Sequence, residues 1–283
     1  MNYRHVYHAG NFADVLKHVI LARIVTYLKL KPQPFRVIDL HAGAGLYDLT
    51  GEEAGKTGEW RDGIGRLRDA DLEPGVRELL APYLDTISAI NGEGAVKFYP
   101  GSPLLARALM RDCDTLVANE LHPDDAMALK SALRRHEASK VTTLDAWTAI
   151  KALLPPPERR GIVLIDPPFE QPDEFERMTD AIKAGLQRFA SAVYIVWYPI
   201  KNVIAANDMV DAVTRLGCPK MLDVRLKIAE PFPGLGLTET GVLLLNPPFS
   251  LKDELNLVMP ALAARLGQDR GAAFTVAEPG GND

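Results

Sequence analysis

Short apolar runs alternate with helical segments along most of this 283-residue chain, and this alternation constrains the fold more than any other feature. Each run has the length of a buried strand, and the segments between most of them repeat apolar residues at helical spacing. Strands that alternate with helices build a doubly wound, mostly parallel sheet. The last two runs lack a helical segment between them, which predicts an antiparallel hairpin at one edge. The seven expected strands cover residues 35–40, 115–120, 141–144, 161–165, 192–199, 221–227 and 241–246.

The apolar run at 161–165 ends abruptly at Asp166-Pro167-Pro168-Phe169. Proline cannot donate to a sheet ladder, so the chain must leave the sheet at this point. Ligands of open α/β sheets collect at the carboxyl ends of the strands. A carboxylate and a flat ring held there can orient a planar amine. The alternative is a strand-ending turn in which the aspartate caps the next helix.

A glycine-rich turn follows the first expected strand, in Asp39-Leu40-His41-Ala42-Gly43-Ala44-Gly45. Two glycines allow the backbone to approach a ligand closely. The third glycine of the dinucleotide-binding fingerprint is absent, which disfavours a nicotinamide or flavin cofactor. The spacing Asp-x-x-x-Gly-x-Gly is instead typical of S-adenosylmethionine sites.

Two further strands also end in acids, at Glu120 and Asp145. A carboxylate after the second strand can accept hydrogen bonds from both ribose hydroxyls of a nucleoside cofactor. Asp145, near the third strand, can accept from an adenine amine. Either acid alone could be a helix cap. Three acids in sheet order beside two glycines favour the cofactor, and with the terminal hairpin they predict a Rossmann-like class I methyltransferase fold.

Asp166 suits methyl transfer to the exocyclic amine of adenine, which is a poor nucleophile because its lone pair is delocalised. The Asp166 carboxylate and the Pro167 carbonyl can accept from the two N–H groups of that amine. The carboxylate can then take the proton that the methylated amine must lose. Phe169 offers a stacking face for a flipped base. This chemistry requires positioning alone, so we predict no metal and no covalent intermediate.

A second proline-proline motif, Asn246-Pro247-Pro248-Phe249, competes with the first by residue type. Asp166 follows the fourth strand and leaves chain for three more strands. Asn246 follows the last strand, so a catalytic Asn246 would leave the sheet unfinished. We therefore expect Asn246 to have a structural or substrate-flanking role.

The histidines do not show the carboxylate-histidine spacing of a zinc site, and we expect His18 and His41 to donate hydrogen bonds to the cofactor. The two cysteines lack motif spacing, which suits a reducing cytoplasm. We find no apolar run long enough for a membrane span and therefore expect no membrane partner.

The net charge of −5 argues weakly against nucleic acid. Local basic clusters at Arg4, Lys17, Arg134-Arg135-His136 and Arg159-Arg160 could nevertheless contact an RNA backbone together with Tyr3 and Tyr7.

The chain divides into a methyltransferase domain and a small insertion. We assign residues 1–50 and 97–270 to the domain, with residues 1–34 as an N-terminal motif and helix capped by Asn11. Residues 51–96 are charged and punctuated by glycine, and we expect a helical insertion there. Residues 271–283 end in glycine and polar residues, and we expect a disordered tail.

Several segments of the chain resemble those of the J-type large-subunit 23S ribosomal RNA adenine-N6 methyltransferases, the RlmJ family. The similarity extends in order along nearly the whole chain, and its N-terminal segment is the most specific part. The matching segments are His8-Ala9-Gly10-Asn11-Phe12-Ala13-Asp14-Val15-Leu16-Lys17-His18, Asp39-Leu40-His41-Ala42-Gly43-Ala44-Gly45, Tyr99-Pro100-Gly101-Ser102-Pro103, Glu120-Leu121-His122-Pro123, Asp166-Pro167-Pro168-Phe169 and Trp197-Tyr198-Pro199.

The resemblance implies a monomer that methylates one adenine of naked or partly assembled 23S rRNA with S-adenosylmethionine, releasing S-adenosylhomocysteine. It implies that Asp166 accepts the proton and that Tyr3 touches the substrate adenosine. It further implies cofactor contacts from His18, His41, Ser102, Glu120, Asp145, Ala146 and Asp166.

The chain departs from the family pattern at two positions. Ala146 stands where glycine is usual, which restricts the approach of the backbone to the cofactor. Phe169 stands where tyrosine is common, so stacking survives but a hydroxyl hydrogen bond is lost. Two other functions remain open: a DNA adenine-N6 or cytosine-N4 methyltransferase, and a non-catalytic RNA-binding assembly protein.

Overall fold

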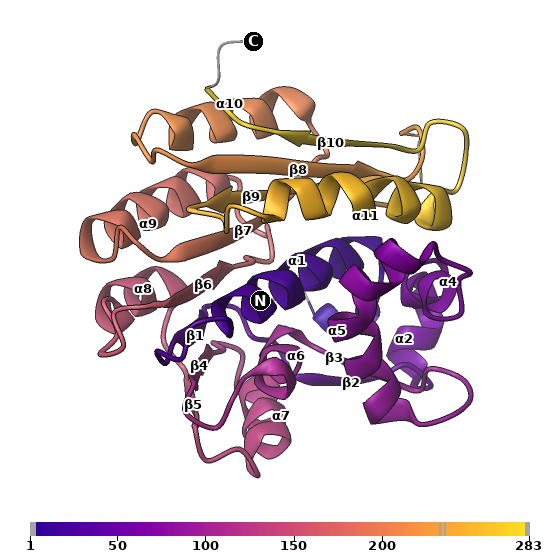
Figure 1. The fold of residues 1–283 in the computed structure, drawn as a ribbon, viewed down its shortest axis with the longest axis horizontal. Helices are drawn as coiled ribbons and strands as arrows, with labels where there is room; N and C mark the ends of the chain where they lie inside the picture. The colour runs from indigo at the N-terminus through magenta and orange to yellow at the C-terminus, as the bar shows by residue number, and fades with distance from the viewer. Residues whose placement is uncertain (1–3, 232–233, 235, 281–283) are drawn as a thin grey trace.

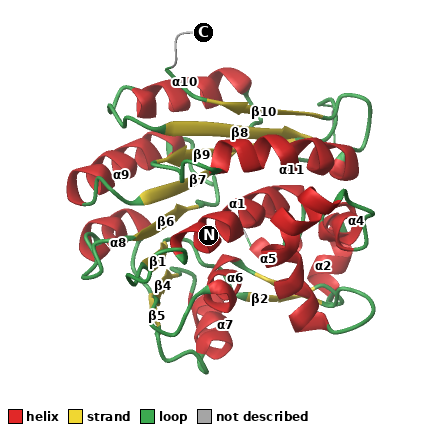
Figure 2. Ribbon diagram, in the orientation of Figure 1, coloured by secondary structure: helices red, strands yellow, loops and turns green. Residues whose placement is uncertain are grey.

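The central element of the molecule is a twisted sheet with helices on both faces (Figures 1 and 2). The computed structural model describes residues 4–231, 234 and 236–280. Within them the sheet has eight strands in the order β10-β8-β9-β7-β6-β1-β4-β5. The strands are β1 (Arg36–Asp39), β4 (Thr115–Asn119), β5 (Ser139–Thr142), β6 (Gly161–Ile165), β7 (Val193–Pro199), β8 (Met221–Lys227), β9 (Glu239–Leu245) and β10 (Ala273–Ala277).

Strand direction matches the expected methyltransferase sheet. Strands β5, β4, β1, β6 and β7 run parallel, so their carboxyl ends share one edge. Strand β9 lies antiparallel between β7 and β8 and forms the expected terminal hairpin with β8. The Rossmann-like class I methyltransferase fold is therefore confirmed, and the strand-end acids Asp39, Glu120 and Asp166 come to the same edge.

Alternate side chains of the central strands enter two different cores. In β6, Ile162 and Leu164 join the core under the helices of one face, and Val163 and Ile165 join the core under the other. A strand that is buried on both faces needs an uninterrupted apolar run, which explains the composition of these segments. The first face carries α1 (Phe12–Leu28), α6 (Ser102–Leu109), α7 (Pro123–Leu133) and α11 (Leu251–Leu266), and the second carries α8 (Ala146–Leu153), α9 (Glu174–Arg188) and α10 (Val203–Thr214).

Helix α1 is buried on nearly all sides, between α5, α6, α11 and strand β9. Its N-cap is Asn11, as expected, whose side chain accepts from the Asp14 backbone N–H at 3.0 Å. Three charged or titratable side chains of α1, Asp14, Lys17 and His18, are at most 4% exposed. Such burial is costly unless the groups are paired, so each of these side chains needs a polar partner close by.

The insertion at residues 51–96 contains four helices beside the first face of the sheet, α2 (Glu52–Thr57), α3 (Glu59–Asp62), α4 (Ile64–Arg68) and α5 (Pro74–Asn91). Its ends are tied together by a two-stranded sheet of β2 (Leu46–Asp48) and β3 (Phe98–Pro100). In Figure 1 these violet helices gather on one side of α1. The short helix η1 (His5–Tyr7) precedes α1 and contacts α2.

The expectation of a disordered tail from residue 271 is wrong for the residues that the structure describes. Residues 273–277 form β10, which pairs antiparallel with β8 along the edge of the sheet. The segment Ala273-Phe274-Thr275-Val276-Ala277 has strand composition, but sequence periodicity does not reveal an open edge that can pair with it. The sheet therefore has one strand more than the seven expected.

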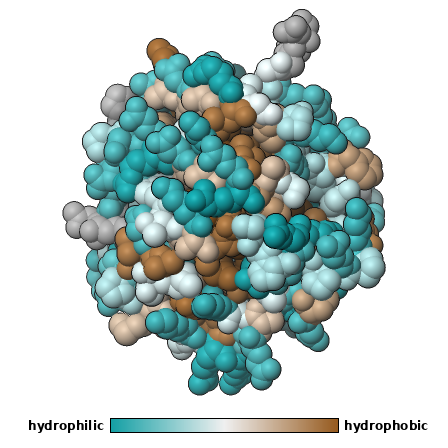
Figure 3. Space-filling view, turned by 90° about the vertical axis from the view of Figure 1, so that its left-hand side faces the viewer, coloured by the Kyte–Doolittle hydropathy of each residue, from teal (hydrophilic) through white to brown (hydrophobic). Residues whose placement is uncertain are grey.

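One face of the molecule is mostly hydrophilic (Figure 3). On the face in Figure 3, hydrophilic side chains surround a central band of apolar ones. None of the described helices combines the length and the apolar character that crossing a bilayer requires.

The second proline-proline motif lies at the opposite edge of the sheet from Asp166. Because β9 is antiparallel, its last residue, Leu245, pairs with Tyr194 near the amino end of β7. The Asn246 amide donates to the carbonyls of Ala190 and Ala192 at 2.8 and 2.9 Å, and its backbone has a left-handed φ of 53°. Asn246 therefore fastens the end of β9 to the loop before β7, far from the edge where the acids gather.

This geometry predicts that Asn246→Ala lowers the free energy of unfolding by about 2 kcal/mol, because two hydrogen bonds are lost and alanine tolerates a left-handed φ poorly. Urea denaturation measures the change. Asn207→Ala, at an exposed position in α10, is the matched control and should have little effect. Equal stability of the two variants would contradict a fastening role for Asn246.

Candidate active site

Two cavities open at the carboxyl edge of the parallel strands and meet at Asp166. The first has a volume of about 310 Å³ and is bordered by the glycine turn and the strand-end acids. The second has a volume of about 580 Å³. It is bordered by the end of β7 and by residues 4–11, which precede α1 and are called the N-terminal segment below. Both are lined by His5, Lys17, Asp166, Pro167 and Pro168. A reaction between a ligand in each cavity would take place beside the Asp166 carboxylate.

The glycine turn forms one wall of the first cavity. Gly43 and Gly45 have φ values of 59° and 81°, which side chains rarely adopt. A Cβ on Gly43 would also lie 2.1 Å from the hydroxyl of Tyr47. Both the backbone conformation and the packing therefore require glycine at position 43.

Glu120 and Asp39 are fastened to backbone around this turn. Glu120 accepts from Gly43 N at 2.8 Å and from His122 N at 2.7 Å. Asp39 accepts from the Ser102 hydroxyl at 2.6 Å, and burial raises the pKa of Asp39 to about 6. Burial also raises the pKa of Glu120. A carboxylate can accept about four hydrogen bonds, so Glu120 keeps capacity for hydroxyl groups of a ligand.

Asp145 and Ala146 border the same cavity at the start of α8. Asp145 caps this helix by accepting from Thr148 N at 3.1 Å. The alternative that this acid is a helix cap is therefore correct. Its side chain is 46% exposed and keeps an oxygen near the cavity, 3.9 Å from Arg177. The Arg177 guanidinium lies over the ring of Trp147, at 5.5 Å from its centroid. Capping and ligand binding are compatible at this position.

His18 and His41 are both neutral polar groups of the cavity wall. Burial lowers the pKa of His18 to about 3 and that of His41 to about 4. His41 Nδ1 accepts from the backbone N–H of Asp166 at 3.2 Å, so the neutral ring carries its proton on Nε2. His18 Nδ1 bonds the Tyr99 hydroxyl at 2.7 Å, and its buried Nε2 has no partner among the described residues. In either tautomer His18 offers one unsatisfied polar atom beside the first cavity.

Lys17 connects the N-terminal segment to Asp166, a function that the sequence analysis missed. Its ammonium group contacts Asp166 Oδ2 and lies 2.9 Å from Asp14 Oδ1. Burial alone would lower the pKa of Lys17, but the two carboxylates raise it above its usual value, so Lys17 stays charged. Asp14 also bonds His5 Nε2 at 2.9 Å. The signal in the sequence is a polar Asp-x-x-Lys-His within a helix that is otherwise mostly apolar.

Aromatic rings form part of the second cavity. Phe169 has a left-handed φ of 52° and packs edge-on against Phe175 and Trp197, at centroid distances of 5.0 and 5.7 Å. Phe169 and Trp197 both line the cavity. A non-glycine residue in this conformation costs free energy, so the surrounding packing must hold the Phe169 ring in place.

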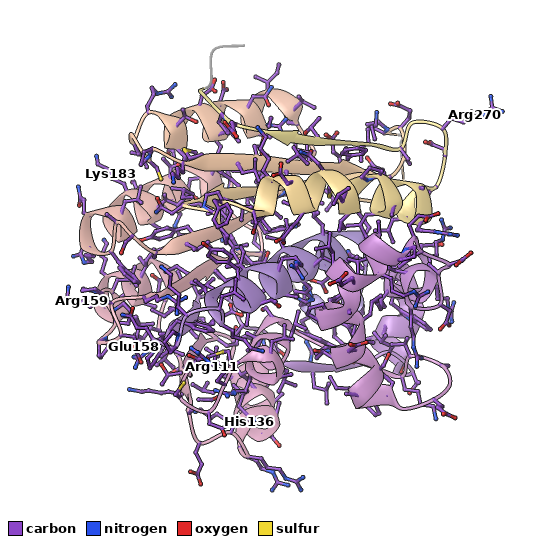
Figure 4. The ribbon with its side chains drawn as sticks, in the orientation of Figure 1. Arg111, His136, Glu158, Arg159, Lys183 and Arg270 are labelled. Carbon is purple, nitrogen blue, oxygen red and sulfur yellow. The ribbon has the colours of Figure 1, made fainter. Side chains whose placement is uncertain are left out.

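Two of the basic clusters that were expected to contact RNA lie away from the site. Tyr3, the expected contact to the substrate adenosine, lies outside the described residues. Arg159-Arg160 precede β6 and Arg134-Arg135-His136 precede β5, so both basic clusters lie at the sheet edge opposite Asp166. Figure 4 labels Arg159 and His136 at the outer margin of the molecule. These two clusters do not border either cavity.

The chain is similar to proteins of one family along nearly its whole length. A family model described as "Ribosomal RNA large subunit methyltransferase D, RlmJ" matches residues 32–276. Two curated proteins named Ribosomal RNA large subunit methyltransferase J are similar. The protein of Escherichia coli (strain K12) is 38% identical over 266 residues, 94% of each chain, and that of Haemophilus influenzae (strain ATCC 51907) is 37% identical over 277 residues, 98% of each.

A crystal structure of a Legionella pneumophila protein has the same fold. It is 32% identical and superposes with a TM-score of 0.88, covering 96% of this chain and 98% of the other. This agreement includes the insertion, because a match that lacked residues 51–96 could not cover so much of the chain.

The buried His18 ring predicts how stability depends on pH. Its folded pKa, about 3, lies below the unfolded value of about 6.5. The unfolded state therefore binds more protons between these values, and His18 destabilises the fold as the pH falls below about 6.5. The wild type should lose about 1.3 kcal/mol per pH unit more than His18→Asn between pH 5.5 and 4.5, where an unfolded histidine is almost fully protonated. Denaturant unfolding at several pH values measures both slopes, and parallel curves would contradict a buried neutral His18.

Proposed function

Because the chain belongs to the RlmJ family of ribosomal RNA large subunit methyltransferases, we propose that it methylates the N6 amine of one adenine in 23S rRNA. The observation that carries this proposal is the meeting of two cavities at Asp166. The first cavity suits the methyl donor and the second suits a flipped base. Action on naked or partly assembled rRNA, as a monomer and in the cytoplasm, remains a prediction.

The first cavity fits S-adenosylmethionine, which supplies an electrophilic methyl group on a sulfonium. The Gly43 turn offers close backbone approach. Glu120 is held where it can accept from ribose hydroxyls, and Asp145 with Ala146 borders the place of an adenine. His18 Nε2 is the buried polar atom that needs a ligand partner, and His41 and Ser102 complete the polar wall.

The Asp166 carboxylate carries out the proton chemistry in this proposal. Lys17 holds Oδ2, and Oδ1 can accept from one N–H of the substrate amine. The Pro167 carbonyl can accept from the other N–H, which directs the nitrogen lone pair toward the first cavity. Asp166 then accepts the proton that the methylated amine releases. Phe169 and Trp197 supply flat walls for the base.

Lys17 has a positioning role in this mechanism. The fixed ammonium prevents rotation of the carboxylate, so one oxygen keeps its direction toward the substrate. Its charge is balanced by Asp14 and Asp166 together, which makes the buried lysine tolerable. The Asp166 backbone is held separately by His41, through the hydrogen bond to Nδ1. Both the backbone and the side chain of Asp166 are therefore positioned before substrate arrives.

The amine chemistry by itself also suits a DNA amino-methyltransferase, and family membership is what favours RNA. An assembly protein without activity would have no need of an aligned Lys17–Asp166 pair. We therefore keep the rRNA methyltransferase as the single proposal.

Asp166→Asn and Asp166→Ala should lower the rate of methyl transfer by a factor of about 10² to 10⁴, since proton acceptance and amine alignment are lost. Transfer of labelled methyl groups to a 23S rRNA transcript measures this rate, and mass spectrometry locates N6-methyladenine. Asn246→Ala, from the second motif, is the control that should retain activity under conditions where it is folded. Full activity in Asp166→Ala would refute the mechanism, and preferential methylation of duplex DNA would refute the substrate.

Glu120→Gln should weaken S-adenosylmethionine binding on the order of tenfold, because an amide cannot accept both ribose hydroxyls and the Gly43 N–H. Isothermal titration calorimetry with the purified protein measures the dissociation constant. Glu137→Gln, at an exposed position outside the cavity, is the matched control. Unchanged affinity in Glu120→Gln would remove Glu120 from the cofactor site.

A further inference from the structure

The helical insertion has the wrong charge for a surface that binds RNA phosphates. Residues 51–96 contain ten acidic and five basic residues, a formal charge of −5 that equals the net charge of the whole chain. Phosphate-binding surfaces are normally basic, since their affinity comes from cations that replace the counterions of the nucleic acid. The acidic insertion therefore needs a function other than binding RNA phosphates.

Its side chains instead bind the N-terminal segment. Glu59, the first residue of α3, accepts from His8 Nδ1 at 3.0 Å and from the Asn11 amide at 2.9 Å. The Thr57 hydroxyl donates to the carbonyl of Tyr7, and Ile64 N donates to the carbonyl of Gly10 at 2.9 Å. Three of the four insertion helices, or their termini, thus hold residues 7–11.

Backbone packing is equally close at the same place. A Cβ on Gly63 would lie 2.1 Å from the Gly10 carbonyl oxygen, so the two segments touch with no side chain between them. Such contact leaves the N-terminal segment little freedom to shift while the insertion stays folded.

The held segment leads directly to the catalytic carboxylate. Asn11, whose amide is bound by Glu59, caps α1 through the Asp14 backbone N–H. The Asp14 carboxylate accepts from Gly10 N at 2.9 Å and binds Lys17, which contacts Asp166. An unbroken series of polar contacts therefore runs from Glu59 to Asp166.

We propose that the insertion is a brace, and that Glu59 is a positioning residue that holds the N-terminal segment, and through it Lys17, in register with Asp166. Its effect on turnover rests on the proposed methyl transfer, whereas its effect on the N-terminal segment does not. A misplaced carboxylate slows a step that depends on alignment without changing how the cofactor binds. Glu59 borders the second cavity and not the first, so the insertion acts on the reaction without contributing to the cofactor wall.

The test compares Glu59→Ala, Glu59→Gln and the control Glu52→Ala, an exposed acid on α2 whose ion-pair partner is Lys56. Hydrogen exchange of residues 4–15 is measured in the free proteins, and kcat and KM are measured with a 23S rRNA transcript. Glu59→Ala should raise exchange in this segment, and lower kcat, on the order of tenfold each, with KM for S-adenosylmethionine unchanged. Glu59→Gln, which can still accept from Asn11, should recover part of both effects, and Glu52→Ala should match the wild type.

Unchanged exchange in Glu59→Ala would overturn the brace. So would a variant in which KM for RNA rises while kcat is unchanged, because that result would make the insertion an RNA contact. If Glu59→Ala exchanges faster but the wild type does not methylate rRNA, the brace stands and the proposed function fails. Exchange in α5 serves as the internal check, since general unfolding would accelerate it equally.

Discussion

The structure depends on the ion pair between the buried Lys17 and the partly buried Asp166. Lys17 lies on a helix at the start of the chain, and Asp166 lies 149 residues later at the end of β6. Lys17 could not be buried alone without a penalty of several kcal/mol, so it requires the carboxylates of Asp166 and Asp14. The pair links α1, the N-terminal segment and the central sheet at the point where the two cavities meet.

Strand direction is the second constraint. The five parallel strands bring acids from distant parts of the chain to one edge, and the antiparallel β9 directs Asn246 to the other. Two motifs with nearly the same residues therefore have different roles. At Asp166 the prolines leave a carboxylate beside two cavities, whereas at Asn246 they leave an amide that donates to the carbonyls of Ala190 and Ala192 in the loop before β7.

The ligand-binding groups are stabilised mainly by backbone. Gly43 N holds Glu120, Asp166 N bonds His41, and Thr148 N bonds Asp145. Such contacts form when the fold forms and do not wait for a ligand, so the site is organised in advance. The exceptions are the buried Nε2 of His18 and Nε1 of Trp197, which have no partner among the described residues, and atoms of this kind are where a ligand gains the most from binding.

The sequence by itself determined most of the elements and the candidate site: strands from uninterrupted apolar runs, the glycine turn, the strand-end acids and the order that separates Asp166 from Asn246. These are local properties, because propensity, backbone sterics and strand polarity act over a few residues. Only the tertiary structure decided that β10 pairs with β8, that Lys17 meets Asp166 and that Glu59 holds Asn11. Such contacts join residues distant along the chain, and a buried charge reveals its partner only when packing brings the two together.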